Sequence, residues 1–307
     1  MSLIVVGTMA FDAIETPFGK TEKIIGGSAN YVAFAASNFV QPIHQVSIVG
    51  YDYPQEELNY LKQIGVSLEG VEVKQDVKSF FWSGRYHMDM NTRDTLTTDL
   101  NALADFDPHI PEAYQEAEFL MLGNVMPRLQ INVMEELRTK PKLTVLDTMN
   151  FWMETAMDDL KQAMTMVDVL LVNDSEARQL SGEFSLVKAA RKILKMGPQY
   201  LIIKKGEHGA LLFYDDQVFF APALPLEDVF DPTGAGDTFA GGFMGHLART
   251  KDISFQNMKT AIIVGSAMAS FCVEKFGPEK LKEITREDID RRLRQFQELV
   301  NFDIELV

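Results

Sequence analysis

The 307-residue sequence has a single cysteine, Cys272, so it cannot form an internal disulfide bond. It also lacks any uninterrupted apolar run of the ~20 residues needed to cross a bilayer. No basic segment with a small-residue cleavage site precedes the first apolar run, residues 3–6, so we expect no signal peptide. These absences predict a cytoplasmic protein without a membrane partner.

Positive charge is scarce as well. Lysine and arginine total 29 against 44 aspartate and glutamate residues, which gives a net charge of −15. A surface this acidic repels a phosphate backbone, which argues against nucleic acid as a partner. If the protein handles a nucleotide, it must do so locally, with backbone N–H groups and a few placed cations.

Several catalytic patterns are missing too. The five histidines are scattered without metal-ligand spacing, which argues against a protein-bound zinc ion. No Gly-x-Ser-x-Gly stretch occurs, and residues 7–10 do not form the glycine-rich turn of a nicotinamide-dependent oxidoreductase.

What is present is an alternation of short apolar runs and amphipathic helical stretches. Because the runs are continuously apolar, they are typical of parallel strands covered on both faces, and their alternation with helices predicts a doubly wound α/β sheet. With no repeat and no flexible linker, we expect a single domain over residues 1–307. The clearest runs are residues 3–6, 119–122, 143–146, 169–172 and 200–203.

Polar side chains follow four of these runs, where the carboxyl ends of parallel strands line a ligand crevice. They are Asn124, Asp147, Asn173 and Lys204.

Two segments break the alternation, residues 8–25 and about 71–98, which are strand-like and free of helical pattern. We interpret them as a small β-sheet lid over the main sheet; the alternative is a pair of edge hairpins without a catalytic role. The second segment is rich in aromatic residues, which predicts cover by a second subunit or by a ring of the substrate, and hence a homodimer through the lid. Arg85 and Arg93 also lie there, and we expect exposed lid charges, although inward-facing guanidinium groups would suit a phosphate or carboxylate.

The stretch from Asp231 to Gly242 carries the clearest chemistry. Gly234, Ala235 and Gly236 allow a tight turn whose N–H groups point to one place at the start of a helix, which is an anion hole. Asp237 follows directly and can take the proton of an attacking hydroxyl. No Gly-Lys-Ser/Thr follows, so the stretch is not a P-loop. The structural alternative is close helix packing through the later glycines, with Asp237 as a helix N-cap.

Residues 231–237 resemble the C-terminal signature of the ribokinase-like (PfkB) carbohydrate kinase family. Three further motifs occur in the family's order: a di-glycine element at residues 26–30, Asn-x-x-Glu at residues 173–176, and a nucleotide-side turn at residues 204–209. The resemblance implies a ribokinase-like fold with a small β-lid. It also implies an ATP-dependent phosphotransferase that acts on a hydroxyl group of a small molecule.

The same resemblance assigns roles to individual positions. It implies that Asp237 is the catalytic base and that Gly234, Ala235 and Gly236 form the anion hole. Substrate hydroxyls would contact Asp12, Gly27, Asn30 and Asn124, while the nucleotide would contact Lys204, Gly206, Thr233 and Gly277. Asn173 and Glu176 would order the water molecules around Mg²⁺, and Asp231 would lie near a site for a monovalent cation such as K⁺.

Departures from the family pattern bear on the acceptor. Ala10 stands where ribokinase-like sequences often have a sugar-binding asparagine, Asn124 stands where ribokinase has an acid, and the di-glycine element is one residue shorter than in ribokinase. We therefore expect a sugar or sugar-like polyol other than ribose, with a nucleoside as the alternative because the lid is aromatic. A non-catalytic binding protein on the same scaffold is disfavoured, because Asp237 is present.

Overall fold

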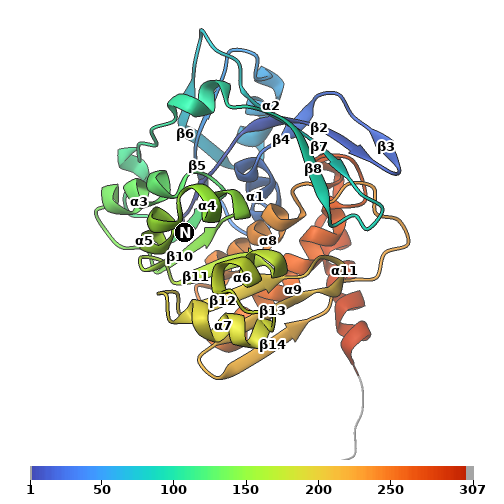
Figure 1. Ribbon diagram of the computed structural model, residues 1–307. Helices are drawn as coiled ribbons and strands as arrows, with labels where there is room; N and C mark the ends of the chain where they lie inside the picture. The colour runs from blue at the N-terminus through green and yellow to red at the C-terminus, as the bar shows by residue number, and fades with distance from the viewer. Residues whose placement is uncertain (1, 302–307) are drawn as a thin grey trace, which may run out of the picture.

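The computed structural model describes residues 2–301 and is built around a nine-stranded sheet (Figure 1). The strand order is β14-β13-β12-β11-β10-β9-β1-β5-β6, parallel from β12 to β6 and antiparallel at β13 and β14. The strands are β1 (Leu3–Val6), β5 (Ile43–Val49), β6 (Val66–Val73), β9 (Phe119–Leu122), β10 (Leu143–Asp147), β11 (Val169–Asn173), β12 (Tyr200–Lys204), β13 (Ala210–Tyr214) and β14 (Gln217–Ala221).

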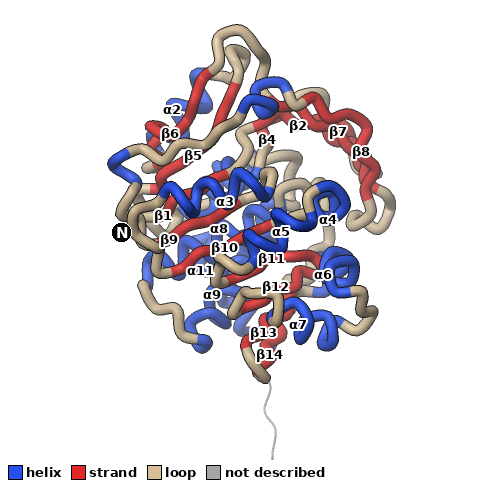
Figure 2. The backbone as a smooth tube through the Cα atoms, turned by 60° about the vertical axis from the view of Figure 1, so that its left-hand side comes forward, coloured by secondary structure: helices blue, strands red, loops and turns tan. Residues whose placement is uncertain are grey.

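Helices cover both faces of this sheet, as Figure 2 shows. The apolar core beneath one face includes α1 (Ser28–Ala36), α2 (Gln55–Gln63), α8 (Ala235–Thr250), α9 (Phe255–Cys272), α10 (Glu279–Glu283) and α11 (Arg286–Val300). The core of the other face includes α3 (Pro127–Glu136), α4 (Asn150–Thr155), α5 (Met157–Met164), α6 (Asp174–Ser181) and α7 (Leu186–Leu194). Short 3₁₀ turns complete the chain at Asn101–Asp105, Glu112–Tyr114 and Gly206–His208.

The first strand shows why the apolar runs are continuous. Leu3 and Val5 belong to one core and Ile4 and Val6 to the other, and all four are fully buried. Because successive side chains of a strand point to opposite faces, a strand between two helical layers needs an apolar residue at every position. The predicted doubly wound sheet is confirmed, and each of the five predicted runs forms a strand.

A second, five-stranded sheet extends beyond the main one (Figure 1). It consists of β2 (Ala10–Thr16), β3 (Gly19–Lys20), β4 (Ile24–Gly26), β7 (Phe80–Tyr86) and β8 (Arg93–Asp99), and we call it the lid. One boundary differs from the expected range of 71–98. Residues 71–73 end β6, which pairs with β5 in the main sheet, so the second lid segment begins at Phe80.

Among the helices described, none combines the length and the apolar character that crossing a membrane requires.

Candidate active site

The turn before α8 has a backbone that only glycine fits comfortably. Gly234 is the N-cap of α8 with φ 74°, in the left-handed region. A Cβ atom at this position would lie 2.4 Å from the ring of Tyr31, so the turn also presses against α1. As a result α8 begins at Ala235, and Asp237 lies in its first turn.

This turn leaves two amide groups without a backbone acceptor among the described residues, as an anion hole requires. The N–H of Ala235 donates to the carbonyl of Pro232 at 3.2 Å, whereas within residues 2–301 the N–H groups of Gly236 and Asp237 donate to no other residue's backbone. They lie at the positive end of the α8 dipole, which favours a bound anion.

The glycines that follow Asp237 in α8 also have the structural role that we considered as the alternative, which is close helix packing. A Cβ on Gly241 or Gly245 would collide with α1, and one on Gly242 would collide with α9, so these glycines do permit close helix packing. Asp237 is not the N-cap, however, because Gly234 occupies that position. Asp237 therefore plays no capping role that would explain its presence.

Burial and charged neighbours together determine the pKa of Asp237. Burial and the nearby carboxylate of Asp147 raise its pKa above the ordinary range, and the cations of Lys204 and Arg93 oppose this rise. A carboxyl group with a raised pKa is a stronger base than an ordinary aspartate, which suits it to accept a proton from a hydroxyl.

Lys204 and Asp147 meet at the ends of β12 and β10. The Lys204 ammonium lies 3.1 and 3.2 Å from the two carboxylate oxygens of Asp147. A Cβ on Gly236 would lie 3.1 Å from the same ammonium, so Lys204 rests against the anion-hole turn. The sequence placed both residues at the crevice but did not reveal that they pair.

Arg93 begins β8 of the lid, and its charge acts on the carboxyl groups of Asp12, Glu176 and Asp237, whose pKa values it lowers against the larger raising effect of burial. Arg93 is nevertheless exposed, as expected, and only its charge connects it with these carboxyl groups. Arg85 is exposed as well and pairs with Glu15 at 2.8 Å within the lid.

Asp12 on β2 lies beside the di-glycine element at the start of α1. The carboxylate of Asp12 is 5% exposed and packs on Gly26, where a Cβ would lie 1.9 Å from it. Gly27 has φ 94° and caps α1. Both glycines of the element are thus required, one to make room for Asp12 and one to turn the chain into the helix.

Asn30 and Asn124 are both held by protein groups. The Asn30 side chain is fully buried and donates to the carbonyl of Gly26 at 2.6 Å and to the hydroxyl of Tyr53 at 2.9 Å. Asn124 accepts a hydrogen bond from the Trp152 indole at 2.8 Å and directs its amide NH₂ group toward the sulfur of Met149. Asn30 therefore supports the di-glycine turn, and contact of either residue with substrate stays a prediction.

The lid lies against the nucleotide-side turns. The hydroxyl of Thr233 donates to the hydroxyl of Tyr86 at 3.2 Å. A Cβ on Gly206, where φ is 54°, would lie 2.2 Å from the side chain of Asn91. Residues separated by more than one hundred positions in the chain are thus brought together around one site.

Comparison with known proteins agrees with this geometry. Residues 2–284 match the family described as pfkB family carbohydrate kinase. The chain belongs to this family. It is a kinase, a phosphotransferase with an alcohol group as acceptor, and the predicted ribokinase-like fold is confirmed.

The relatives of the chain include kinases of nucleosides and kinases of sugars. The chain is 28% identical to a cytidine kinase of Thermococcus kodakarensis over 258 residues, 82% of this chain and 91% of that protein. It is 26% identical to a nucleoside kinase of Methanothermobacter thermautotrophicus, over 96% of both chains. The crystal structure of a Methanocaldococcus jannaschii nucleoside kinase superposes with a TM-score of 0.77 at 20% identity, covering 96% of this chain and 98% of that one.

The kinase family implies ATP and, typically, Mg²⁺. No cluster of three potential protein ligands for a metal occurs within the residues described. Glu176 nevertheless fits a role beside a hydrated ion. It is 7% exposed, burial raises its pKa to about 7, and one of its oxygens accepts from the N–H of Asn173 at 2.7 Å. In return Asn173 accepts from the N–H of Glu176, so the two residues form the capping box of α6.

Asp231 ties the catalytic turn to the end of α9. Its two oxygens accept hydrogen bonds from the N–H groups of Thr233 at 2.8 Å and Gly277 at 2.9 Å, and the residue is fully buried. Gly277 has φ 62°, so its position requires the conformational freedom of glycine. The arrangement explains these three residues structurally, and a monovalent cation beside Asp231 stays a prediction.

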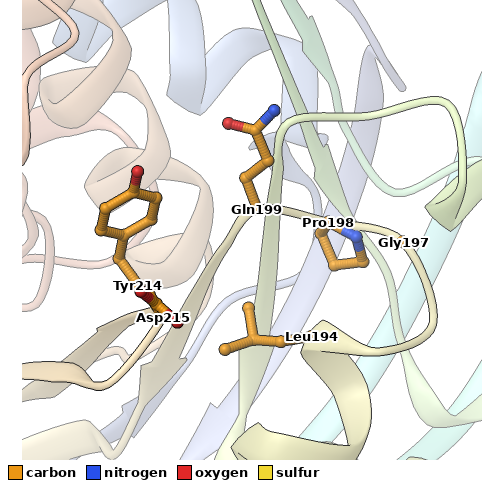
Figure 3. Close-up of a pocket in the computed structure, with 6 residues that line it drawn as sticks. All are labelled: Leu194, Gly197, Pro198, Gln199, Tyr214 and Asp215. Atoms are coloured by element: carbon orange, nitrogen blue, oxygen red, sulfur yellow. The ribbon is translucent and has the colours of Figure 1, made fainter.

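A surface depression of about 420 Å³ lies outside the site. Figure 3 shows its lining, which includes Leu194, Gln199 and Tyr214. Gln199 precedes the first residue of β12, whereas Lys204 ends that strand. The depression therefore lies at the opposite end of β12 from the catalytic residues.

Proposed function

We propose that this kinase transfers the γ-phosphoryl group of ATP to a hydroxyl of a nucleoside. The proposal rests on the Asp237 site together with two relatives, named cytidine kinase and nucleoside kinase, that match most of the chain. These comparisons favour the nucleoside alternative over the sugar or polyol that we placed first.

The arrangement of residues supports a simple division of the pocket. Asp12 lies on β2, Gly27 precedes α1 and Asn124 follows β9. Strand β7, which pairs with β2, carries the aromatic residues Phe80, Phe81 and Trp82. Carboxylate and amide groups suit the hydroxyls of a ribose ring, and an aromatic lid suits a nucleobase.

In the reaction, Asp237 takes the proton of the acceptor hydroxyl while the oxygen of that hydroxyl forms a bond to the γ-phosphorus of ATP. The bond between that phosphorus and the β–γ bridging oxygen breaks, and ADP leaves. The amides of Gly236 and Asp237 and the positive charges of Lys204 and Arg93 stabilise the charge on the transferred group. When bound with the triphosphate, Mg²⁺ would neutralise part of the phosphate charge, with its water molecules near Glu176 and Asn173.

The test is release of ADP from Mg·ATP with a panel of nucleosides, ribose, other sugars and inositols. We expect turnover with one or more nucleosides, and a fall in kcat on the order of 1,000-fold in Asp237→Asn. Asp216→Asn, an exposed position in the β13–β14 turn, is the matched control and should match the parent. Turnover restricted to sugars would reject the nucleoside assignment, and full activity of Asp237→Asn would reject the mechanism.

We also propose that two copies pair through the lid. Every residue of β8 is exposed, including Leu96 at 51%, and β8 lies at the edge of its sheet. An exposed edge strand with apolar residues is a surface suited to a partner. Sedimentation velocity of the parent and of Leu96→Lys tests this, with a monomeric parent as the contradicting result.

A further inference from the structure

Lys204 occupies an unusual position for a charged residue. It ends β12 beside Asn173, the last residue of β11, and its side chain is 17% exposed. Its ammonium bonds both oxygens of Asp147 and also lies where a Cβ on Gly236 would come within 3.1 Å. Lys204 therefore touches the turn whose amides form the anion hole.

Carboxyl groups outnumber the ammonium group around Lys204. The Lys204 ammonium acts on three carboxyl groups, those of Asp147, Glu176 and Asp237, but is hydrogen-bonded only to the first among the residues described. A structural ion pair requires one carboxylate, and further buried carboxylates beside it cost free energy. They would also repel a triphosphate, so a cation here must offset that repulsion when nucleotide binds.

Lys204 also keeps its charge in this setting. Burial lowers its pKa, but Asp147, Glu176 and Asp237 together outweigh that effect, so the pKa is raised overall. An ammonium group on a flexible four-carbon chain can turn between neighbouring acceptors without a change in the backbone.

We propose that Lys204 is a catalytic cation that rests on Asp147 in the nucleotide-free protein and moves to an oxygen of the transferred phosphoryl group beside Gly236. Asp147 is the positioning residue that holds the ammonium against the anion-hole turn. Lys204 stays protonated throughout, forms no covalent bond, and stabilises the charge of the transition state. This inference rests on the proposed kinase reaction.

Lys204→Met removes the cation with little change in side-chain length. We expect kcat to fall on the order of 100-fold, with the KM for the acceptor nearly unchanged. Lys195→Met is the matched control, because Lys195 is exposed at the end of α7, on the side of the sheet where β12 begins, whereas Lys204 ends that strand. The proposal is overturned if kcat of Lys204→Met equals that of Lys195→Met.

The pH dependence separates a catalytic pair from a structural one. Lys204 lowers the pKa of Asp237 and Asp147 raises it, after the larger effect of burial. The acid limb of kcat/KM should therefore move to higher pH in Lys204→Met and to lower pH in Asp147→Asn, and Lys204→Arg should restore much of the parental limb. A purely structural ion pair would leave both acid limbs unmoved, and that result would reject the positioning role of Asp147.

Calorimetric binding distinguishes failure of this inference from failure of the proposed reaction. Mg·AMP-PNP carries a γ-phosphoryl group and Mg·ADP does not. We expect Lys204→Met to weaken binding of Mg·AMP-PNP about tenfold or more while Mg·ADP is little affected. Equal weakening of both ligands would reject contact with the γ-phosphoryl group even if the parent is an active nucleoside kinase. A parent that binds neither ligand would reject the proposed reaction itself.

Discussion

The carboxyl group of Asp12, on strand β2 of the lid, is buried, and burial, together with the charges of Asp231 and Asp237, raises its pKa to about 8. In the unfolded chain an aspartate loses its proton near pH 4. Between about pH 4 and pH 8 the folded state therefore binds more protons than the unfolded state, and the free energy of unfolding contributed by this group falls as the pH rises. Asp12 therefore costs stability at neutral pH, which is consistent with the predicted role of its carboxylate in binding substrate hydroxyls.

Asp12→Asn should consequently be more stable and less active than the parent. At about pH 8 we expect its Tm to rise by roughly 2–4 °C, and at about pH 5 the gain should shrink, because the parental carboxyl group is then protonated. Differential scanning calorimetry at both pH values, with turnover measured in parallel, checks this. A Tm gain that is the same at both pH values would show that the carboxylate charge is not its cause.

At the scale of single residues, the sequence predicts those positions whose residue type is dictated by local backbone geometry. Gly234 and Asp237 could be predicted because a positive φ and a carboxylate in the first helical turn leave a local pattern. The ion pair between Asp147 and Lys204 could not be predicted, because these residues are separated by 57 positions and meet only when β10 and β12 lie on either side of β11.

At the scale of elements, the capping box of α6 connects stability with the proposed nucleotide site. Asn173 and Glu176 bond each other's backbone N–H groups, and Thr285 and Asp288 do the same at the start of α11. Asn173→Ala and Thr285→Ala should each lower the free energy of unfolding by about 1 kcal/mol, because each removes a cap.

Only Asn173→Ala should also affect activity. We expect it to raise the Mg²⁺ concentration needed for half-maximal rate, whereas Thr285→Ala should not, since α11 lies far along the chain on the opposite helical layer. Chemical denaturation and an Mg²⁺ titration of the initial rate measure the two effects. Equal Mg²⁺ requirements in the two variants would leave Asn173 with the structural role alone.

Strands could be predicted where a single pattern of apolar residues dominates. The continuously apolar strands between the two helical layers were predicted at their observed positions, because burial on both faces requires an apolar residue at every position. The range of 71–98 was wrong at its start, because β6 lies at the edge of the main sheet and only its first residue, Val66, is buried. Its pattern resembles that of a lid strand, and only its pairing with β5 distinguishes the two.

The whole molecule combines a net charge of −15 with two cations, those of Lys204 and Arg93, at a single site. Lys204 comes from the main sheet and Arg93 from the lid, so the positive charge around Asp237 is complete only when the two sheets are together. The sequence indicated that nucleotide binding must depend on few placed cations, but it could not identify Arg93 among the lid charges. The direction of the Arg93 side chain depends on how the lid packs against the turn at residues 234–236.

Arg93 and Arg85 provide a matched pair for testing this arrangement, because both are exposed lid arginines but only the charge of Arg93 affects the pKa of Asp237. Arg93→Met should lower kcat on the order of 100-fold, because a positive charge next to the transferred group is lost. Since Arg93 lowers the pKa of Asp237, its removal should raise that pKa further and move the acid limb of kcat/KM to higher pH.

Arg85→Met should leave both quantities near the parental values, because the exposed ion pair with Glu15 contributes little free energy and lies within the lid. Initial rates over a range of pH, with the folded state of each variant checked by circular dichroism, make the comparison. If the two variants lose activity equally, the loss reflects a general disturbance of the lid. A shift of the acid limb confined to Arg93→Met would instead tie the lid directly to the chemistry at Asp237, because only a charge near that carboxyl group can change its pKa.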